Sequence, residues 1–434
     1  MVSNDGGRRL AAALAGVVGP QHVITDADRW ESYAQDWTRR FSGQPAAVVR
    51  PSNTAEVAEV VSVCRRLRAP VVPQGGNTGL VGASTPRGQG MVVLSTRRLS
   101  ELGPVDVDSR QVTVGAGATV AALQAHARAA QLDYGVDLAS RDSATVGGTI
   151  ATNAGGIRVV RHGDTRAQVV GVEAVLGDGR VISHLHGLPK DSAGYDLSGL
   201  LVGSEGTLGV VTRARVRLVD PLPRGRSTVL VGVRDVPAAV RMLRSQPQLL
   251  AAEFVVGDAM ALVCDVTGLP FPLRSPWPLY VLLETAAELA LDGDDDAVVD
   301  PRVWAYRERQ TEAIATLGVV HKLDVAVPLG RLQDFLTALP ETAAPFGVFA
   351  FGHLAEGNVH VEIVGAAPDD ERPDEAVLRL AASLGGTISA EHGVGTAKAR
   401  WLSLSRSAAE IDAMRAVKRA LDPDGLLNPG VLFP

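Results

Sequence analysis

A glycine-rich stretch, Pro73-Gln-Gly-Gly-Asn-Thr-Gly-Leu-Val-Gly-Ala83, determines how this sequence is interpreted. It follows an apolar run and carries four glycines in eleven residues, with no lysine or arginine. Glycine permits backbone conformations in which consecutive N–H groups converge on an anion, so this loop can hold a pyrophosphate through peptide dipoles instead of side-chain charge. A simple tight turn explains any single loop of this kind equally well.

Two further segments of similar composition weaken the explanation by turns alone. They are Ala144-Thr-Val-Gly-Gly-Thr-Ile-Ala-Thr-Asn-Ala-Gly-Gly156 and Gly203-Ser-Glu-Gly-Thr-Leu-Gly-Val-Val211. Three such loops in one predicted domain favour a cradle for a dinucleotide. The segment Gly115-Ala-Gly-Ala-Thr-Val120 only superficially suggests the GxGxxG fingerprint, because Val120 stands in place of the third glycine and no acidic residue ends a strand about 20 residues later. We therefore do not expect a Rossmann site.

The residues around these loops predict a mixture of strands and helices. Short apolar runs bounded by Gly, Pro and Asp recur from Ala46 to Val219 and are typical of strands. Helices are predicted at Thr54–Leu67, with Thr54 as the N-cap, and at Val120–Ala130. The amphipathic pattern from Arg8 to Trp37 is also helical.

A proline-rich join, Asp220-Pro-Leu-Pro223, indicates a domain boundary. Beyond it, predicted strands alternate with predicted helices at Val236–Ser245 and Trp304–Leu317. A last helix at Ser407–Leu421 precedes a tail that we expect to return to the first domain.

Composition excludes several classes of function. The 434 residues contain 46% apolar residues, enough for two or three domains, and the formal charge of −6 comes without a basic patch, so nucleic acid is not an expected partner. Cys64 and Cys264 are far apart, which fits a reducing cytoplasm. Leu10–Val18 is too short for a membrane-spanning helix, so we expect no transmembrane segment and a cytoplasmic protein, with peripheral contact to a membrane left open.

Three histidines lie close together near the end of the chain: His353, His360 and His392. The run Val359–Val364 alternates as a strand, which places His360 and Glu362 on one face, and a turn before it could return His353 beside His360. Two imidazoles and the carboxylate of Glu391 would form a three-ligand metal site with open positions, suited to zinc or manganese. On spacing alone, histidines with purely structural roles are the commoner outcome.

Several phrases together resemble one known family: PQGGNTGLVGAS, TVGGTIATNAGG, VGSEGTLGVVT, GHLAEGNVHVE, SAEHGVGTAK and LNPG. They are similar to the FAD-linked oxidases of the vanillyl-alcohol oxidase type, in the branch of D-lactate and D-2-hydroxyglutarate dehydrogenases and glycolate oxidase flavin subunits. The resemblance spans about residues 20 to 434. It implies an α+β fold, with a two-subdomain FAD-binding domain, a substrate (cap) domain built on an antiparallel sheet, and a C-terminal helical return.

The resemblance also implies domain limits and binding residues. We expect an N-terminal helical segment at 1–44, the FAD-binding domain at 45–221, the cap domain at 222–395, and a C-terminal segment at 396–434 that packs back on the FAD domain. The positions that would contact FAD are Pro73, Gly75, Gly76, Asn77, Thr78, Gly79, Leu80, Ala144, Thr145, Gly147, Gly148, Thr149, Asn153, Gly155, Gly156, Glu205, Gly206, Gly209, Val210, Val211 and Asn428. Since the first loop contains no His or Cys, we expect the FAD to be bound non-covalently.

By the same resemblance, His353, His360 and Glu391 would hold a divalent metal, with Zn²⁺ favoured and Mn²⁺ as the alternative. His392 would be the catalytic base and contact the substrate. The remaining implied substrate-binding residues are Arg307, Thr311, Lys322 and Glu362.

Two positions depart from the pattern of the D-2-hydroxyglutarate dehydrogenases. Glu362 stands where those enzymes carry a substrate-contacting Asn, and Leu323 stands where their Lys-Tyr-Asp phrase has Tyr. An added carboxylate opposes a dianionic substrate, so the sequence leaves open which 2-hydroxy acid is bound.

The implied function is an FAD- and metal-dependent dehydrogenase that oxidises a D-2-hydroxy acid to the 2-oxo acid, most like D-2-hydroxyglutarate dehydrogenase. The substrate C–H bond is not acidic, so hydrogen would leave as hydride to flavin N5 while the metal and His392 assist loss of the hydroxyl proton. Two alternatives stay open: a D-lactate or broad-range D-2-hydroxy-acid dehydrogenase, and a flavin-binding subunit of a glycolate-oxidase-like complex. An electron-transfer flavoprotein or a quinone would be the electron acceptor, and a homodimer is compatible with the sequence.

Overall fold

A computed structural model describes residues 4–246, 248–287, 289 and 296–434. The chain forms two compact units. Unit 1 comprises residues 1–155, 163–221 and 391–434, and unit 2 comprises residues 156–162 and 222–390. Unit 1 is therefore assembled from three separate stretches of sequence.

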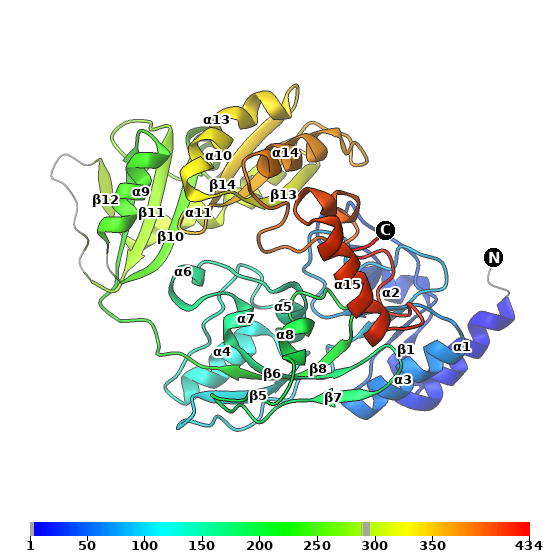
Figure 1. The fold of residues 1–434 in the computed structure, drawn as a ribbon. Helices are drawn as coiled ribbons and strands as arrows, with labels where there is room; N and C mark the ends of the chain where they lie inside the picture. Colours follow the sequence, from blue (N-terminus) through cyan, green and yellow to red (C-terminus); the bar gives the residue numbers. More distant parts are fainter. Residues whose placement is uncertain (1–3, 247, 288, 290–295) are drawn as a thin grey trace. The chain divides into compact units, whose positions relative to one another are not determined.

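The first part of unit 1, which is coloured blue in Figure 1, contains a small sheet with the strand order β1-β2-β4-β3. Its strands are β1 (Val23–Ile24), β2 (Ala47–Val49), β3 (Val71–Gln74) and β4 (Val92–Ser95), and its helices are α1 (Asn4–Val18), α2 (Ala27–Ala34) and α3 (Thr54–Arg66). Strands β2, β3 and β4 are parallel, and their apolar side chains are buried against α1 and α3 on one face and beside α2 on the other. This burial on both faces explains why the strands read as continuous apolar runs.

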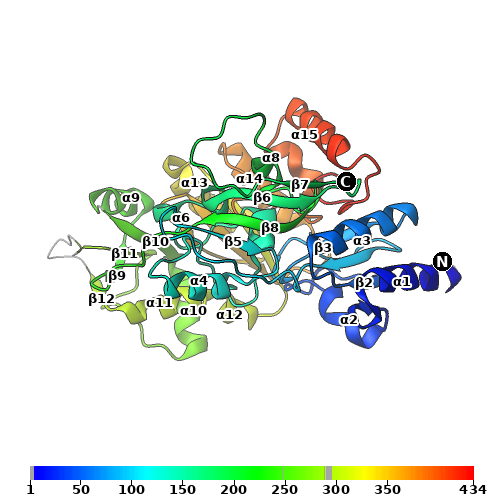
Figure 2. The ribbon, with the colours of Figure 1, turned by 90° about the horizontal axis from the view of Figure 1, so that it is seen from below.

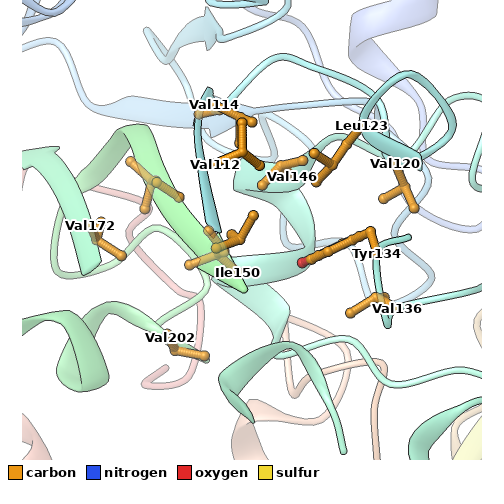
Figure 3. Close-up of a cluster of buried hydrophobic side chains, with 14 of the residues drawn as sticks. Val112, Val114, Val120, Leu123, Tyr134, Val136, Val146, Ile150, Val172 and Val202 are labelled. Carbon is orange, nitrogen blue, oxygen red and sulfur yellow. The ribbon is translucent and has the colours of Figure 1, made fainter. Parts of the chain in front are cut away.

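The second part of unit 1 is an antiparallel sheet with the order β5-β8-β6-β7 (Figure 2). Its strands are β5 (Gln111–Gly115), β6 (Val169–Val175), β7 (Val181–Ser183) and β8 (Val210–Arg217); the helices in this part are α4 (Val120–Ala129), α5 (Val146–Thr152), α7 (Thr165–Gln168) and α8 (Leu197–Leu201). Figure 3 shows the core, where Val112 and Val114 of β5 meet Leu123 of α4 and Ile150 of α5. Burial of this cluster fixes α5, and with it one of the glycine loops.

The last stretch of unit 1 contains α15 (Ala408–Leu421) and a tail. Leu427 pairs with Val71 in a parallel bridge, and the N–H of Asn428 donates to the Val71 carbonyl at 2.7 Å. The tail therefore extends the edge of the first sheet beside the strand that leads into the first glycine loop.

Unit 2 is built on a seven-stranded sheet with the order β12-β9-β11-β10-β14-β15-β13 (Figure 1). The strands are β9 (Ser227–Val233), β10 (Leu249–Val256), β11 (Leu279–Thr285), β12 (Ala297–Val299), β13 (Val320–Ala326), β14 (Gly347–His353) and β15 (Asn358–Val364). All the pairings are antiparallel. The α+β class and the antiparallel sheet expected from the sequence are thus confirmed.

Helices cover both faces of this sheet. One face packs on α10 (Gly257–Thr267), α11 (Trp304–Glu308) and α12 (Gln310–Ala315), and the other on α9 (Val236–Ser245), α13 (Leu332–Ala343) and α14 (Arg372–Ser383). The short α6 (Val159–His162) contacts β10. Charged side chains on the α10–α12 face are consequently buried under helices, which requires each of them to have a partner.

Some predicted element boundaries need correction. The N-cap of α3 is Asn53, whose side chain accepts the Glu56 N–H, and not Thr54. The predicted helix at Trp304–Leu317 is divided into α11 and α12 at Arg309, and the helical N-terminal region includes the short strand β1. Among the described residues, no helix combines the length and the apolar character needed to cross a bilayer.

Candidate functional site

The first glycine loop of unit 1 presents unused hydrogen-bond donors. Within the described residues, the backbone N–H groups from Gly76 to Leu80 donate to no acceptor. Asn77 takes a positive φ of 58°, and its side-chain amide donates to the carbonyls of Ser32 and Gln35, so that side chain anchors the loop to α2. A run of open N–H groups with one left-handed residue is the geometry of an anion-binding nest.

A cation lies beside this loop although the loop itself contains none. The guanidinium of Arg97 donates to the carbonyls of Gly75 and Gly76, at 3.2 Å and 3.0 Å. These bonds turn the two carbonyls toward Arg97. Positive charge next to a loop with open N–H groups favours binding of a phosphate. The sequence analysis did not identify Arg97 as a candidate for this role.

The second and third glycine loops pack on each other. In the second, Thr145 caps α5 through the Gly148 N–H, and the N–H groups of Val146 and Gly147 donate to Ala118 and Ala116. In the third, the N–H groups of Gly203 and Glu205 donate to Ile150 and Ala151 of α5. Their amides are thus largely used within the protein, unlike those of the first loop.

Close approach explains the glycines where the first and second loops meet. A Cβ on Gly75 would come within 2.2 Å of the Thr145 hydroxyl, and a Cβ on Gly76 within 2.0 Å of the Ser143 carbonyl. Asn428 joins the first and third loops, because its side-chain amide donates to the carbonyls of Ala83 and Glu205. All three loops and the tail therefore converge in unit 1.

The carboxylate of Glu205 has a role inside the protein. It is 5% exposed and accepts the N–H groups of Val394 and Gly395, at 2.8 Å and 2.7 Å. Burial raises the pKa of Glu205 to about 7, an effect that these two hydrogen bonds and the charge of Lys398 only partly offset. Glu205 was predicted to contact FAD, and that contact stays a prediction.

The other positions predicted to contact FAD lie mostly in unit 1. Pro73 is in β3, and Val210 and Val211 begin β8. Asn153 ends α5 in the left-handed conformation, and its side chain donates to Asp164. Gly156 opens the short segment of unit 2.

In unit 2, one face of the sheet carries a row of polar side chains. The register pairs Glu253 with His353, Asp324 with His360, and Lys322 with Glu362. Because side chains alternate along a strand, these six residues share the face covered by α10, α11 and α12. The expected return of His353 beside His360 is present, with the ring centroids 5.2 Å apart.

Glu253, on β10 at one end of this row, binds two other polar side chains. Its side chain is 1% exposed; one carboxylate oxygen lies 2.6 Å from His353 Nδ1, and the other accepts the Nε–H of Arg307 at 2.8 Å. Because an ionised carboxylate can only accept hydrogen bonds, Nδ1 of His353 is the donor in this contact, and Nε2 is the ring nitrogen that could bind a metal. This is the arrangement that orients a metal-binding imidazole.

Glu253 binds only the Nε–H of the Arg307 guanidinium. The guanidinium stacks over the Phe351 ring at 4.6 Å, and among the described residues its terminal nitrogens have no acceptor. The Arg307 side chain is only 13% exposed and pairs with Glu253, so it is not part of a surface ion pair. The two terminal nitrogens can grip a carboxylate.

Lys322 and Glu362 form a second buried ion pair. Lys322 Nζ lies 2.6 Å from Glu362 Oε1, which also accepts the hydroxyl of Thr311 at 3.2 Å. The side chains of Lys322 and Glu362 are 8% and 4% exposed. Lys322 therefore does not face solvent.

Asp324 is fully buried beside His360. Its Oδ1 lies 3.7 Å from His360 Nδ1 and accepts the side-chain amide of Asn358 at 2.8 Å. Its Oδ2 accepts the N–H of Ala390 at 3.0 Å.

The predicted metal ligands are divided between the two units. Asp324 and His360 lie beside each other in unit 2, whereas Glu391 and His392 open the last stretch of unit 1, with His392 Nε2 3.8 Å from Glu391 Oε1. Imidazole nitrogens and carboxylate oxygens suit Zn²⁺ or Mn²⁺. The predicted ligand set of His353, His360 and Glu391 stays a prediction, and Asp324 is a further carboxylate beside His360.

Sequence reasoning did not identify Glu253, Asp324 or Asn358. Glu253 is the single polar residue of its strand, Leu249–Val256, whereas Asp324 and Asn358 lie in strands that carry other polar residues, Val320–Ala326 and Asn358–Val364. A buried charge needs a partner, so the lone carboxylate of Glu253 in an apolar run was an available signal. The partners could not be found because they are distant in sequence.

Two family profiles match the chain. Residues 45–184 match the FAD binding domain, and residues 222–432 match the C-terminal domain of FAD linked oxidases. The chain is 36% identical over 456 residues to a mitochondrial D-2-hydroxyglutarate dehydrogenase of Bos taurus, covering 98% of this chain and 83% of that protein. It is 37% identical over 459 residues to a D-2-hydroxyglutarate dehydrogenase of Xanthomonas citri pv. viticola, covering 97% of this chain and 96% of that one.

Solved structures share the fold. p-Cresol methylhydroxylase with substrate bound matches with a TM-score of 0.79 at 16% identity, over 99% of this chain and 97% of that one. An alkyldihydroxyacetonephosphate synthase matches with a TM-score of 0.73 at 16% identity, over 97% of this chain and 84% of that one. The expected vanillyl-alcohol oxidase type of fold is confirmed.

Proposed function

The chain belongs to the FAD-linked oxidases, in the branch of D-lactate and D-2-hydroxyglutarate dehydrogenases, and from this we propose that it oxidises a D-2-hydroxy acid to the 2-oxo acid with the help of a divalent metal. One observation carries the proposal. The polar row of the unit 2 sheet brings His353 beside His360, which suit a metal, and Glu253 of the same row binds Arg307 of α11, which suits a carboxylate. A 2-hydroxy acid needs both kinds of contact, because its hydroxyl and its carboxylate are adjacent.

The residues of unit 1 fit a non-covalently held FAD. The open N–H groups from Gly76 to Leu80 suit the pyrophosphate, and Arg97 adds positive charge beside them. When bound, FAD supplies the hydride acceptor. The loop offers no His or Cys for a covalent link.

The candidate metal ligands fit one divalent ion. When bound, a metal lowers the pKa of a hydroxyl that it contacts. Asp324 and Glu253 keep the rings of His360 and His353 oriented, so that ring nitrogens face a ligand instead of rotating freely. Within the proposal, Zn²⁺ is the first choice and Mn²⁺ the second.

Arg307 and His392 would then have separate roles in substrate binding and proton transfer. Arg307 would hold the substrate carboxylate through its terminal nitrogens, while Glu253 fixes its orientation. His392 would accept the hydroxyl proton as the C–H hydrogen leaves with its electron pair. The electrons would pass on to an electron-transfer flavoprotein or a quinone.

Anaerobic mixing of the FAD-loaded protein with single D- and L-2-hydroxy acids tests the proposal. We expect D-acids to bleach the flavin absorbance and to yield the matching 2-oxo acid in equal amount, while L-acids leave the spectrum unchanged. If no acid of either hand reduced the flavin, the protein would instead be a flavin-binding subunit that acts only within a larger complex.

A second candidate within the same chemistry is a D-lactate or broad-range dehydrogenase. The pairing of Lys322 with Glu362 favours it, because this pairing removes a cation that a second substrate carboxylate would need. The same panel of acids separates the two candidates, since only a dicarboxylate-specific enzyme would prefer 2-hydroxyglutarate.

A further inference from the structure

We infer that Glu362 selects a monocarboxylic D-2-hydroxy acid whose side chain ends in a neutral hydrogen-bond donor, such as an amide or a hydroxyl. The inference rests on the proposed function and concerns which substrate that site accepts. The first observation concerns a buried carboxylate oxygen of Glu362. Glu362 Oε2 is buried and, among the residues that the structure describes, has no hydrogen-bond donor.

The other oxygen of Glu362 is fully engaged. Oε1 receives the Lys322 ammonium at 2.6 Å and the Thr311 hydroxyl at 3.2 Å. The carboxylate is thus held in a fixed place by groups from β13 and α12, so Oε2 also has a fixed place. A buried acceptor without a donor is costly, and a ligand that supplies a donor there recovers that cost.

The charges around Glu362 argue against a second carboxylate on the substrate. Lys322 is already neutralised by Glu362, and the Glu362 carboxylate occupies the position beside Lys322 and Thr311 that a distal carboxylate would need. A dicarboxylic acid would place its anion next to the anion of Glu362. Like charges at close range in a buried site are strongly unfavourable.

A cationic side chain is disfavoured for the complementary reason. An ammonium at Oε2 would lie near Lys322, which shares the same carboxylate. The ion pair is balanced as it stands, so a neutral N–H or O–H adds a hydrogen bond without adding charge. The first carboxylate of the substrate would be taken by Arg307, whose terminal nitrogens are not used by Glu253.

Three acids of almost equal shape test this inference. D-2-hydroxyglutarate ends in a carboxylate, D-2-hydroxyglutaramate carries an amide in its place, and D-2-hydroxy-5-methylhexanoate has an apolar isostere. We expect kcat/KM for flavin reduction to be highest for the amide, by about tenfold or more over either of the others. Equal values for the amide and the apolar acid, or the highest value for the dicarboxylate, would overturn the inference.

Glu362→Gln should reverse the order. It keeps the shape but removes the anion and releases Lys322, so the dicarboxylic acid should gain about tenfold or more in kcat/KM and become preferred over the amide. Glu308→Gln, an exposed change of equal charge on α11, should leave the order as in the unaltered protein. If Glu362→Gln keeps the original order, Glu362 does not select the substrate.

A second variant covers the case in which Glu362→Gln fails to fold, since it leaves Lys322 buried without its partner. The double variant Lys322→Met with Glu362→Gln removes both charges, including the anion that repels a second carboxylate, so the preference for the amide over the dicarboxylic acid should fall by about tenfold or more. An unchanged preference would contradict the inference. If neither these three acids nor shorter D-2-hydroxy acids reduced the flavin of the unaltered protein, the proposed function itself would be contradicted.

Discussion

His353 Nδ1 lies 2.6 Å from Glu253 Oε1, although the two residues are 100 positions apart in the chain. The same carboxylate binds Arg307 through its other oxygen. One buried side chain therefore orients both an imidazole suited to a metal and a guanidinium suited to a substrate carboxylate. Loss of Glu253 should disturb the two functions together.

Glu253→Gln is expected to lower metal affinity and activity by about 10- to 100-fold, as for other carboxylates that orient a metal-binding histidine. The amide can accept one hydrogen bond but cannot neutralise Arg307. Metal affinity measured by competition with a chromogenic chelator, together with kcat and KM, checks this.

Glu284→Gln is the matched control for Glu253→Gln. Glu284 is a buried glutamate in the neighbouring strand β11, paired with Arg158 and Arg226. Its loss should reduce stability without changing metal affinity. Equal effects of the two variants on metal affinity would argue against a special role for Glu253.

Removal of the metal should abolish turnover. Dialysis against a chelator is expected to leave the flavin spectrum intact, and one equivalent of Zn²⁺ or Mn²⁺ should restore activity. His360→Ala should prevent this restoration, because His360 is one of the predicted metal ligands. Full activity of protein shown by elemental analysis to be metal-free would exclude the metal from the reaction.

His392→Ala should lower the rate of flavin reduction by about 10²- to 10⁴-fold, the usual contribution of a general base. FAD content should not change. Stopped-flow measurement of flavin bleaching is the direct assay, with His126→Ala as a control, since His126 binds the Gly103 carbonyl within unit 1. A His392→Ala protein that reduces its flavin at the normal rate would need a different base.

Glu205 should make the protein less stable as pH rises. Its pKa is raised from its usual value to about 7 by burial, so between roughly pH 4.5 and 7 the folded state binds more protons than the unfolded state, and stability falls across that range. Glu205→Gln cannot ionise and should flatten this part of the profile. The difference in Tm between the two proteins, measured from pH 5 to pH 8, gives the answer; parallel profiles would show that Glu205 does not titrate there.

Tyr134→Phe should not destabilise the protein, in spite of its position in the core. The Tyr134 hydroxyl is buried and, within the described residues, has no hydrogen-bond partner. Figure 3 shows its ring among Val136, Leu123 and Ile150. Removal of an unsatisfied hydroxyl should stabilise the fold by about 1 kcal/mol, whereas Leu123→Ala in the same cluster should cost about 2–5 kcal/mol. Chemical denaturation of both variants tests the contrast.

Local patterns allowed much of the fold to be predicted from the sequence. The helix at Val236–Ser245 and the strand at Val359–Val364 follow from periodicity over neighbouring residues, and both are present. The glycine loops were found for the same reason, because each is a short, continuous signal. Cap and boundary errors, such as Asn53 in place of Thr54, arose where adjacent residues are both good caps.

The polar row in unit 2 was only partly predicted, for a physical reason. Histidines at 353 and 360 share one hairpin, so spacing alone suggested their proximity. Glu253 reaches His353 only through the pairing of β10 with β14, a register that no local pattern specifies. Its signal is a single charge in the apolar strand Leu249–Val256, which shows that a partner exists without showing which one.

The three-part make-up of unit 1 sets an order of events during synthesis. Asn428, which ties the first and third glycine loops together, follows the whole main stretch of unit 2 in the chain. A ribosome therefore finishes unit 2 before it releases the residues that complete unit 1. The first and third glycine loops can therefore be tied together only after translation has passed Asn428.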